Sequence, residues 1–159
     1  MNRMQLNKSR FLAVRMLTVA LTFISCAGLA PANNQEPIRL EFRLAEREPA
    51  DGLEEASVEE SNEKIYLHKE AIITNRDVIE ARATRSEQSW EISIAFSKEG
   101  AVRMAQATAQ HIGKPMAILI NGKVVSAPRV NSTVSDRAAI FGSFTKEQAE
   151  KLASEIKGG

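Results

Sequence analysis

The chain has 159 residues, with 21 basic and 20 acidic side chains and a formal net charge of +1 at pH 7. This length is sufficient for one ordinary domain. The near balance of charges, which becomes mildly acidic without the basic N-terminal segment, argues against a nucleic-acid-binding surface, because such a surface requires a basic patch or stripe.

Residues 1–32 are predicted to be an export signal. Four basic residues and no acidic residue precede an apolar run of small and hydrophobic residues, Met16 to Ala30. This order is the pattern of a secretory signal peptide. The run is shorter than the roughly 20 residues that a membrane span needs, although an uncleaved anchor helix is the alternative. Without Arg3, Lys8, Arg10 and Arg15 the remaining chain has 17 basic and 20 acidic residues, a net charge of about −3.

The end of this signal can be interpreted in two ways. Ala30-Pro31-Ala32 fits a small-x-small cleavage site that would leave Asn33 as the first residue. The stretch "FISC", Phe23 to Cys26, resembles a bacterial lipobox, although its first position usually holds leucine. Cys26, the single cysteine of the chain, would then carry a lipid that anchors the protein to a membrane surface. Both interpretations place the protein in the bacterial periplasm or attached to the cell envelope.

Residues 33–61 are predicted to hold a linker, an early strand and an acidic loop. In "RLEFRLAE", Arg39 to Glu46, apolar and charged residues alternate, which indicates a half-buried strand. The segment 47–64 contains Pro49, Asp51-Gly52 and six glutamates, so a solvated loop is expected. The spacing of these carboxylates does not fit an EF-hand calcium loop.

The middle of the chain, 65–96, is typical of strands. "KIYLHKEAII" indicates a strand with a kink near Lys69-Glu70, and Thr74 or Asn75 could cap a short turn after it. Two further strands are joined by a polar turn at 86–89. The second of them directs Trp90, Ile92, Ile94 and Phe96 to one face. Core positions are expected at Trp90, Phe96, Phe141 and Phe144.

A helix, a hairpin and a strand follow. Ser97 is a suitable N-cap for an alanine-rich helix that Gly113 is expected to end. The next apolar run, 116–120, indicates a buried strand. Asn121-Gly122 favours a type I′ hairpin turn, because both positions tolerate positive φ. Pro128 limits the return strand to a sheet edge or a bulge.

The last part of the chain is predicted to be a strand and a second amphipathic helix. The strand covers 138–144 with a bulge at Gly142, and Thr145 and Gln148 form a capping box. The helices can bury their apolar stripes only against a sheet. The fold class is therefore α+β, a two-layer arrangement of a mostly antiparallel sheet with two amphipathic helices packed on one face.

No catalytic, cofactor or metal site is predicted from the side chains. His68 and His111 are far apart in the sequence and lack a nearby second ligand, which makes a poor zinc site. Ser126, His111 and Asp136 could be written as a catalytic triad, but triads are recognised by geometry. The sequence has no nucleophile-elbow pattern to support one.

A series of short motifs follows the strand that ends at Phe96. They are Glu99-Gly100-Ala101, Gly113 to Ile118, Asn121 to Val125, Ser126-Ala127-Pro128, Arg137 to Ile140, Gly142 to Thr145 and Glu147 to Ala149. Taken together, the motifs in 62–157 resemble the head subdomain of the first periplasmic domain of the SecD family. SecD is a membrane subunit of the bacterial protein-export apparatus.

The resemblance implies a binding module and not an enzyme, because the SecD head contacts the emerging polypeptide and has no catalytic residue to transfer. SecD itself is far longer and spans the membrane several times, so its proton-driven translocation is not implied. We expect a stand-alone exported module, without the transmembrane bundle, that contacts polypeptides or envelope proteins. A small envelope hydrolase and a purely structural lipoprotein are the alternatives.

The contact surface is expected at a sheet edge, since an exposed edge can pair with an extended polypeptide. The residues expected to form it are Val124, Val125, Ser126 and Pro128.

Overall fold

The structure, a computed structural model, describes residues 37–87 and 89–158. The predicted export signal, including the candidate lipid-attachment residue Cys26, lies outside the described residues. Contacts divide the chain into two units, residues 1–34 and 35–159, and only the second is described below. In the described part of the chain, no helix has the length and hydropathy needed to cross a membrane.

Apart from the short strand Glu54–Ser57, the elements of this unit follow one another in the order that the sequence predicts. They are β1 (Leu40–Glu46), β2 (Glu54–Ser57), β3 (Lys64–Thr74), a 3-10 turn (Asn75–Asp77), β4 (Val78–Arg85), β5 (Trp90–Phe96), α1 (Lys98–Ala109), β6 (Met116–Ile120), β7 (Lys123–Ser126), β8 (Arg137–Phe144) and α2 (Lys146–Gly158).

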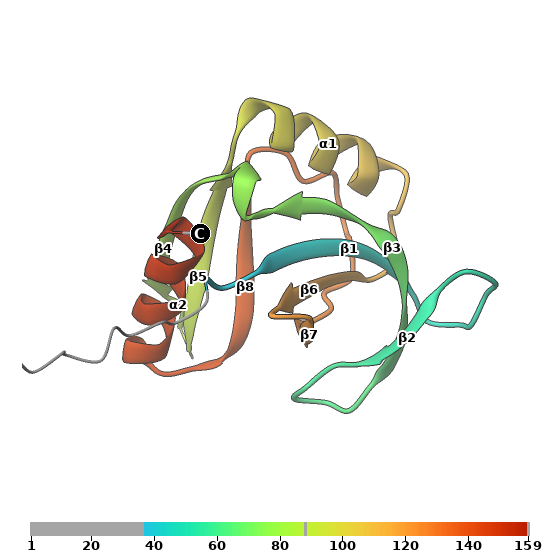
Figure 1. The fold of residues 1–159 in the computed structure, drawn as a ribbon, viewed down its shortest axis with the longest axis horizontal. Coiled ribbons are helices and arrows are strands. Elements are labelled where there is room, and N and C mark those ends of the chain that lie inside the picture. The colour runs from blue at the N-terminus through green and yellow to red at the C-terminus, as the bar shows by residue number, and fades with distance from the viewer. Residues whose placement is uncertain (1–36, 88, 159) are drawn as a thin grey trace, which may run out of the picture. The chain divides into compact units, whose positions relative to one another are not determined.

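The strands form two sheets. One has the order β2-β3-β1-β6-β7 and the other the order β4-β5-β8, and all neighbouring strands are antiparallel. Figure 1 shows the smaller sheet running across the direction of β1 and β3, with α2 packed on β4 and β5. The predicted α+β class with two helices is confirmed. The sequence analysis expected one sheet, whereas the structure has two.

The division occurs at the 3-10 turn, where a side chain fixes the corner. The amide of Asn75 accepts a hydrogen bond from the Leu40 N–H (2.7 Å) and donates to the carbonyls of Ile38 (2.9 Å) and Ile156 (3.1 Å). Asp77 accepts from the Thr74 N–H at 2.9 Å. The chain therefore leaves the first sheet and enters the second with its polar groups satisfied.

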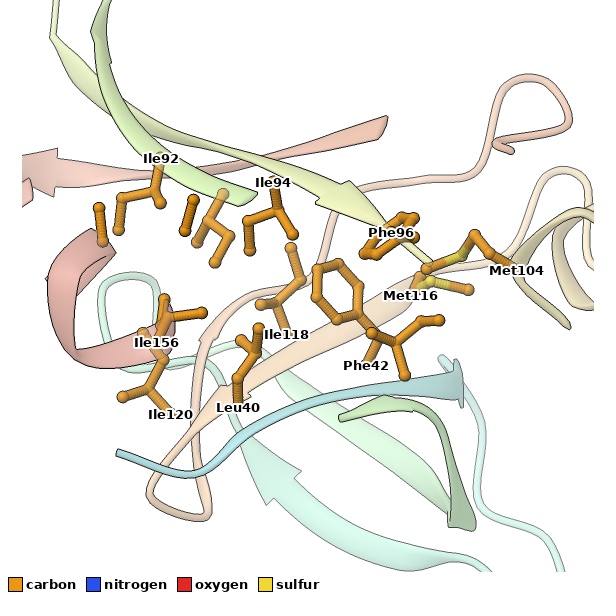
Figure 2. Close-up of a cluster of buried hydrophobic side chains, with 14 of the residues drawn as sticks. Leu40, Phe42, Ile92, Ile94, Phe96, Met104, Met116, Ile118, Ile120 and Ile156 are labelled. Carbon is orange, nitrogen blue, oxygen red and sulfur yellow. The ribbon is translucent and has the colours of Figure 1, made fainter. Parts of the chain in front are cut away.

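The main core lies between the two sheets. Figure 2 shows side chains of β5 pointing toward those of β1 and β6, with Ile156 of α2 at one end and Met104 of α1 at the other. The rings of Phe42 and Phe96 pack edge to face, with centroids 5.7 Å apart. The fully buried or nearly buried members that Figure 2 labels are Leu40, Phe42, Ile92, Ile94, Phe96, Met104, Met116, Ile118, Ile120 and Ile156.

A second, smaller core lies on the other face of the five-stranded sheet. Val58, just after β2, makes a parallel bridge to Val124 of β7, so the two ends of this sheet approach each other. The enclosed side chains are Ala45, Val58, Ile65, Leu67, Ala117, Leu119 and Val124. Strand β6 supplies both cores, which explains why all five of its residues are buried and why its sequence is one apolar run.

The predicted helix starts are confirmed. Ser97 accepts a hydrogen bond from the Gly100 N–H at 3.1 Å. At α2, the Thr145 hydroxyl accepts from the Gln148 N–H, and the Gln148 side chain accepts from the Thr145 N–H, which is a complete capping box. Helix α1 ends at Ala109, before the expected stop at Gly113. After the helix, the His111 ring turns inward to bond the Ala45 carbonyl, and Gly113 adopts a positive φ of 87°.

The predicted turn and bulge are confirmed. Asn121 and Gly122 have φ values of 52° and 81°, as a type I′ turn requires. Pairing of β5 with β8 moves from Ile92–Ile140 to Trp90–Phe144, so the segment around Gly142 bulges. A Cβ at Gly142 would lie 2.7 Å from the Phe144 ring, and this contact explains the glycine.

Two expectations are wrong. The acidic segment 47–64 is not all loop, because Glu54–Ser57 form β2 against β3. Its sequence has little apolar alternation, and ion pairs such as Lys64–Glu55 (2.7 Å) help to hold it. Phe141 is not a core residue: it is 51% exposed, because Ile140 beside it takes the inward position on β8.

Candidate functional site

An apolar groove beside β8 is the candidate site. It encloses about 330 Å³ between α1, β6, the segment 128–134 and β8. Its floor is formed by core side chains, Phe42, Met104, Met116 and Ile118, which lie together in Figure 2. A larger and more open hollow of about 650 Å³ lies along α2, and its lining mixes apolar residues with the charged side chains of Glu60, Lys151 and Glu155.

One wall of the groove is the segment that follows β7. The Met116 N–H donates to the Pro128 carbonyl (2.9 Å), and Val130 exchanges backbone hydrogen bonds with Gly113 (2.8 Å) and Lys114 (2.9 Å). This ladder holds the exposed side chains of Pro128 and Arg129 at the rim. The wall is therefore a fixed part of the fold.

The opposite wall is the free edge of β8, the last strand of the order β4-β5-β8. The Phe96 N–H donates to the Asp136 carbonyl (2.9 Å), and the pairing continues with Ile94–Ala138 and Ile92–Ile140. In an antiparallel pair the hydrogen-bonded residues alternate. The backbone N–H and C=O groups of Arg137 and Ala139 therefore point away from β5, toward the groove side.

The far end of this edge is covered by the turn that joins β2 to β3, called here the 58–63 turn. The carboxylate of Glu60 accepts a hydrogen bond from the Ser143 N–H of β8 at 2.7 Å. The Glu59 N–H donates to the Val124 carbonyl of β7 at 2.9 Å, and Lys123 pairs with the Glu59 carboxylate at 3.1 Å. The turn thus covers both β7 at Val124 and β8 at Ser143. The stretch 137–141 has no strand hydrogen-bonded to its outer edge, although β7 lies near β8, and most of the stretch lines the groove.

The rim of the groove carries positive charge. Its lining includes Arg129 and Arg137 and no acidic side chain. Arg137 lies 3.7 Å from the Glu80 carboxylate, a long and exposed ion pair. The exposed ring of Phe141 stands beside them. A segment lying in this groove would meet an apolar floor, a strand edge and the guanidinium group of Arg129, since that of Arg137 is directed toward Glu80 of β4.

The four residues predicted to form a contact edge lie in different environments. Val124 is 2% exposed and belongs to the smaller core, and Val125 packs against the main core. The Ser126 hydroxyl is buried without a hydrogen-bond partner. Pro128 alone of the four lines the groove.

The two histidines lie close together, and neither lines the groove. Their ring centroids are 5.9 Å apart. His111 is buried, and its Nε2 lies 2.9 Å from the Ala45 carbonyl, so it donates to the backbone. The Ser126 hydroxyl has no hydrogen-bond partner, and Asp136 accepts from Ser135. The side chains of the written triad are therefore not hydrogen-bonded to one another.

Glu46 joins the histidine pair to the groove wall. Its carboxylate lies 2.8 Å from Lys114 Nζ and 3.5 Å from His68 Nε2. Partial burial raises the pKa of Glu46, but the hydrogen bond and positive charge of Lys114, together with the nearby His68 ring, outweigh it, so the pKa lies below its ordinary value. Within 37–87 and 89–158, no three His, Cys, Asp or Glu side chains are grouped closely enough to hold a metal ion.

Sequence reasoning missed the open edge of β8 and the residues beside it. Arg129 and Arg137 are isolated basic residues in the sequence, and Phe141 reads as one more apolar residue of a strand. Alternation around Ile140 could have placed Phe141 on the outer face. Nothing in the sequence indicates which strand edge the 58–63 turn covers.

Comparison with known proteins supports the resemblance of the sequence motifs. A family model for the SecDF P1 head subdomain matches residues 52–159. A protein translocase subunit SecD of Magnetococcus marinus is 31% identical over 140 residues, which cover 76% of this chain and 27% of that protein. The chain therefore spans about a quarter of the length of this curated relative.

Solved structures show the same fold. A crystal structure of SecDF in a super-membrane-facing form has a TM-score of 0.63 at 24% identity and covers 77% of this chain and 19% of that one. A structure of the membrane component SecDF that enhances protein export has a TM-score of 0.62 at 22% identity, with 77% and 63% of the two chains covered.

Proposed function

The chain belongs to the SecDF P1 head subdomain family, and from this membership we propose that it is a non-catalytic module that binds polypeptides. The observation that carries the proposal is the groove beside β8, where an apolar floor adjoins a strand edge with unpaired backbone groups. Polypeptides offer the matching chemistry, namely apolar side chains and backbone hydrogen-bonding groups.

The related proteins support a role in protein transport. The relative from Magnetococcus marinus is a protein translocase subunit, and a SecDF of the same fold enhances protein export. An unfolded chain in transit exposes apolar residues and unpaired backbone. A module with the groove described above would contact such a chain without cleaving or modifying it, and the partner is a polypeptide or another envelope protein.

We place the module outside the cytoplasm, in the periplasm or attached to the envelope membrane. The support is the signal-like pattern of residues 1–32 and the lipobox-like stretch ending at Cys26. Mass spectrometry of the mature N-terminus tests this. A lipid-modified Cys26 indicates an anchored protein and a free Asn33 indicates a released one, while an unprocessed Met1 in the cytoplasm would contradict export.

Site-specific photo-cross-linking tests polypeptide binding. A photoreactive residue replaces Phe141 in the full-length chain, and an unfolded, export-competent polypeptide is added. Val102, 56% exposed on α1 against 51% for Phe141, is the matched control position. We expect cross-links from position 141 well above those from 102. Equal or absent cross-linking at both positions would contradict the proposal.

A further inference from the structure

The outer edge of β8 along residues 137–141 has backbone groups with which a bound polypeptide could pair. Residues 137–141 lie between the Asp136 carbonyl, which is bonded to Phe96, and the Ser143 N–H, which is bonded to Glu60. Among the described residues, the outward N–H and C=O groups of Arg137 and Ala139 have no hydrogen-bond partner in the protein. An edge of this kind is a template for one more strand.

The groove fixes which side chains such a strand would carry. Successive side chains of a strand point to opposite faces of its sheet. A strand added to β8 would direct every second side chain toward the floor formed by Phe42, Met116 and Ile118. The occupant therefore needs apolar residues at alternate positions. The other positions would face solvent and can be polar.

The charged side chains that line the groove limit which peptide sequences can bind there. Arg129 and Arg137 line the groove from its two walls, and no acidic side chain is among the lining residues. A basic segment would be repelled by Arg129, whereas a carboxylate would find the guanidinium of Arg129 at the wall. The rim thus favours a strand that carries an acidic residue near its apolar positions.

We propose that β8 binds an extended polypeptide segment by strand addition along residues 137–141, with apolar residues at alternate positions and an acidic residue beside Arg129. The inference rests on the proposed polypeptide-binding function and specifies how the bound polypeptide pairs with β8. The Ser143 N–H already donates its hydrogen bond to the Glu60 carboxylate. The added strand therefore ends before Ser143 and pairs with a stretch of five residues at most.

Peptide backbone methylation tests strand addition directly. The probe is a fluorescein-labelled peptide of about seven residues, alternating valine and serine with one glutamate, and its binding to the full-length chain is followed by fluorescence anisotropy. Two further peptides carry N-methyl groups on the odd or on the even amides. Only one parity of amides can face β8. We expect one methylated peptide to bind about tenfold more weakly, the loss of a few backbone hydrogen bonds, and the other to bind like the parent.

Charge reversal in the protein is the second arm. Arg129→Glu should weaken binding of the glutamate peptide and strengthen binding of the same peptide with lysine in its place. Arg85→Glu is the matched control, because Arg85 is an exposed arginine at the end of β4, on the other edge of the same sheet. This control should change neither affinity by more than about twofold.

Hydrogen exchange measured by NMR is a readout that does not depend on variants. On peptide binding, the Ala139 amide should become protected, whereas the Ala138 amide, already paired with β5, should change little. Protection at both or neither would overturn strand addition.

The outcomes separate this inference from the proposed function. If polypeptides cross-link to position 141 but both methylated peptides bind like the parent, strand addition is wrong and polypeptide binding stands. The same holds if unfolded polypeptides are captured and no seven-residue probe binds. If neither polypeptides nor peptides are captured, both proposals fail together.

Discussion

Strands β7 and β8 are both edge strands, yet only one of them is open. At β7 the Val124 carbonyl accepts a hydrogen bond from Glu59, and the Val124 side chain is enclosed in the smaller core. At β8 the stretch 137–141 adjoins an apolar groove, and its first contact with the 58–63 turn comes at Ser143.

The difference shows that an edge is defined by what lies beside it in space. Pro128 limits further pairing after β7, and the sequence therefore predicts an exposed edge there. The turn that covers β7 comes from a segment more than 60 positions earlier in the chain. A polar turn can therefore protect one edge while leaving its neighbour accessible.

The largest expected effect is on stability, and it distinguishes the buried face of β8 from its exposed face. Ile140 is fully buried in the main core, so Ile140→Ala should lower the free energy of unfolding by about 2–5 kcal/mol. Phe141→Ala, on the exposed side of the same strand, should change it by no more than about 0.5 kcal/mol. Urea unfolding of the full chain measures both. A large loss for Phe141→Ala would mean that the ring supports the fold, not the groove.

The next effect alters the length of the open edge. Glu60→Ala removes the carboxylate that accepts from the Ser143 N–H and should cost about 0.5–1.5 kcal/mol. It should also lengthen the open edge beyond 141, which would be seen as faster exchange of the Ser143 amide. Glu59→Ala is the control, since its backbone N–H still bonds Val124 and only an exposed ion pair is lost. Equal exchange of Ser143 in both variants would contradict the role of Glu60.

The smallest effect concerns the support of the groove wall. Glu46 has a lowered pKa, so its ion pair with Lys114 stabilises the fold above the unfolded-state pKa. That contribution is lost as the pH falls below about 4.5 and through the folded-state pKa. Glu46→Gln should therefore destabilise the protein slightly at neutral pH, and the gap to the unmodified protein should close toward about pH 3. Unfolding midpoints across this range measure it, and a gap that widens at low pH would reverse the assignment.

Much of the fold could be predicted because its signals are local. Alternation identified β1 and β5, side-chain chemistry identified the caps at Ser97 and Thr145, and Asn121-Gly122 identified the hairpin. Each of these depends on residues within a few positions of one another. The same is true of the bulge at Gly142, which a glycine inside a strand indicates.

The candidate site could be predicted only in part, because it is made of long-range relations. The side chain of Asn75 separates the two sheets through contacts with Ile38 and Ile156, 37 and 81 positions away. Strand β2 is held by its pairing with β3 and by ion pairs, with little apolar alternation of its own. The groove follows from how these parts meet: Pro128, one of the residues predicted for the contact edge, lines it, whereas Arg129, Ala139 and Phe141 were not among the predicted residues.

The pairing of β1 with β6 sets how soon this fold can form. The hydrogen bond between the Arg39 N–H and the Asn121 side chain joins positions 82 residues apart, and it closes the end of the central strand pair. Contacts at such separation slow folding, because a long loop must be closed before they form. During synthesis, β1 lacks its second neighbour until β6 has been made. A chain that completes its sheet so late remains unfolded for longer during synthesis.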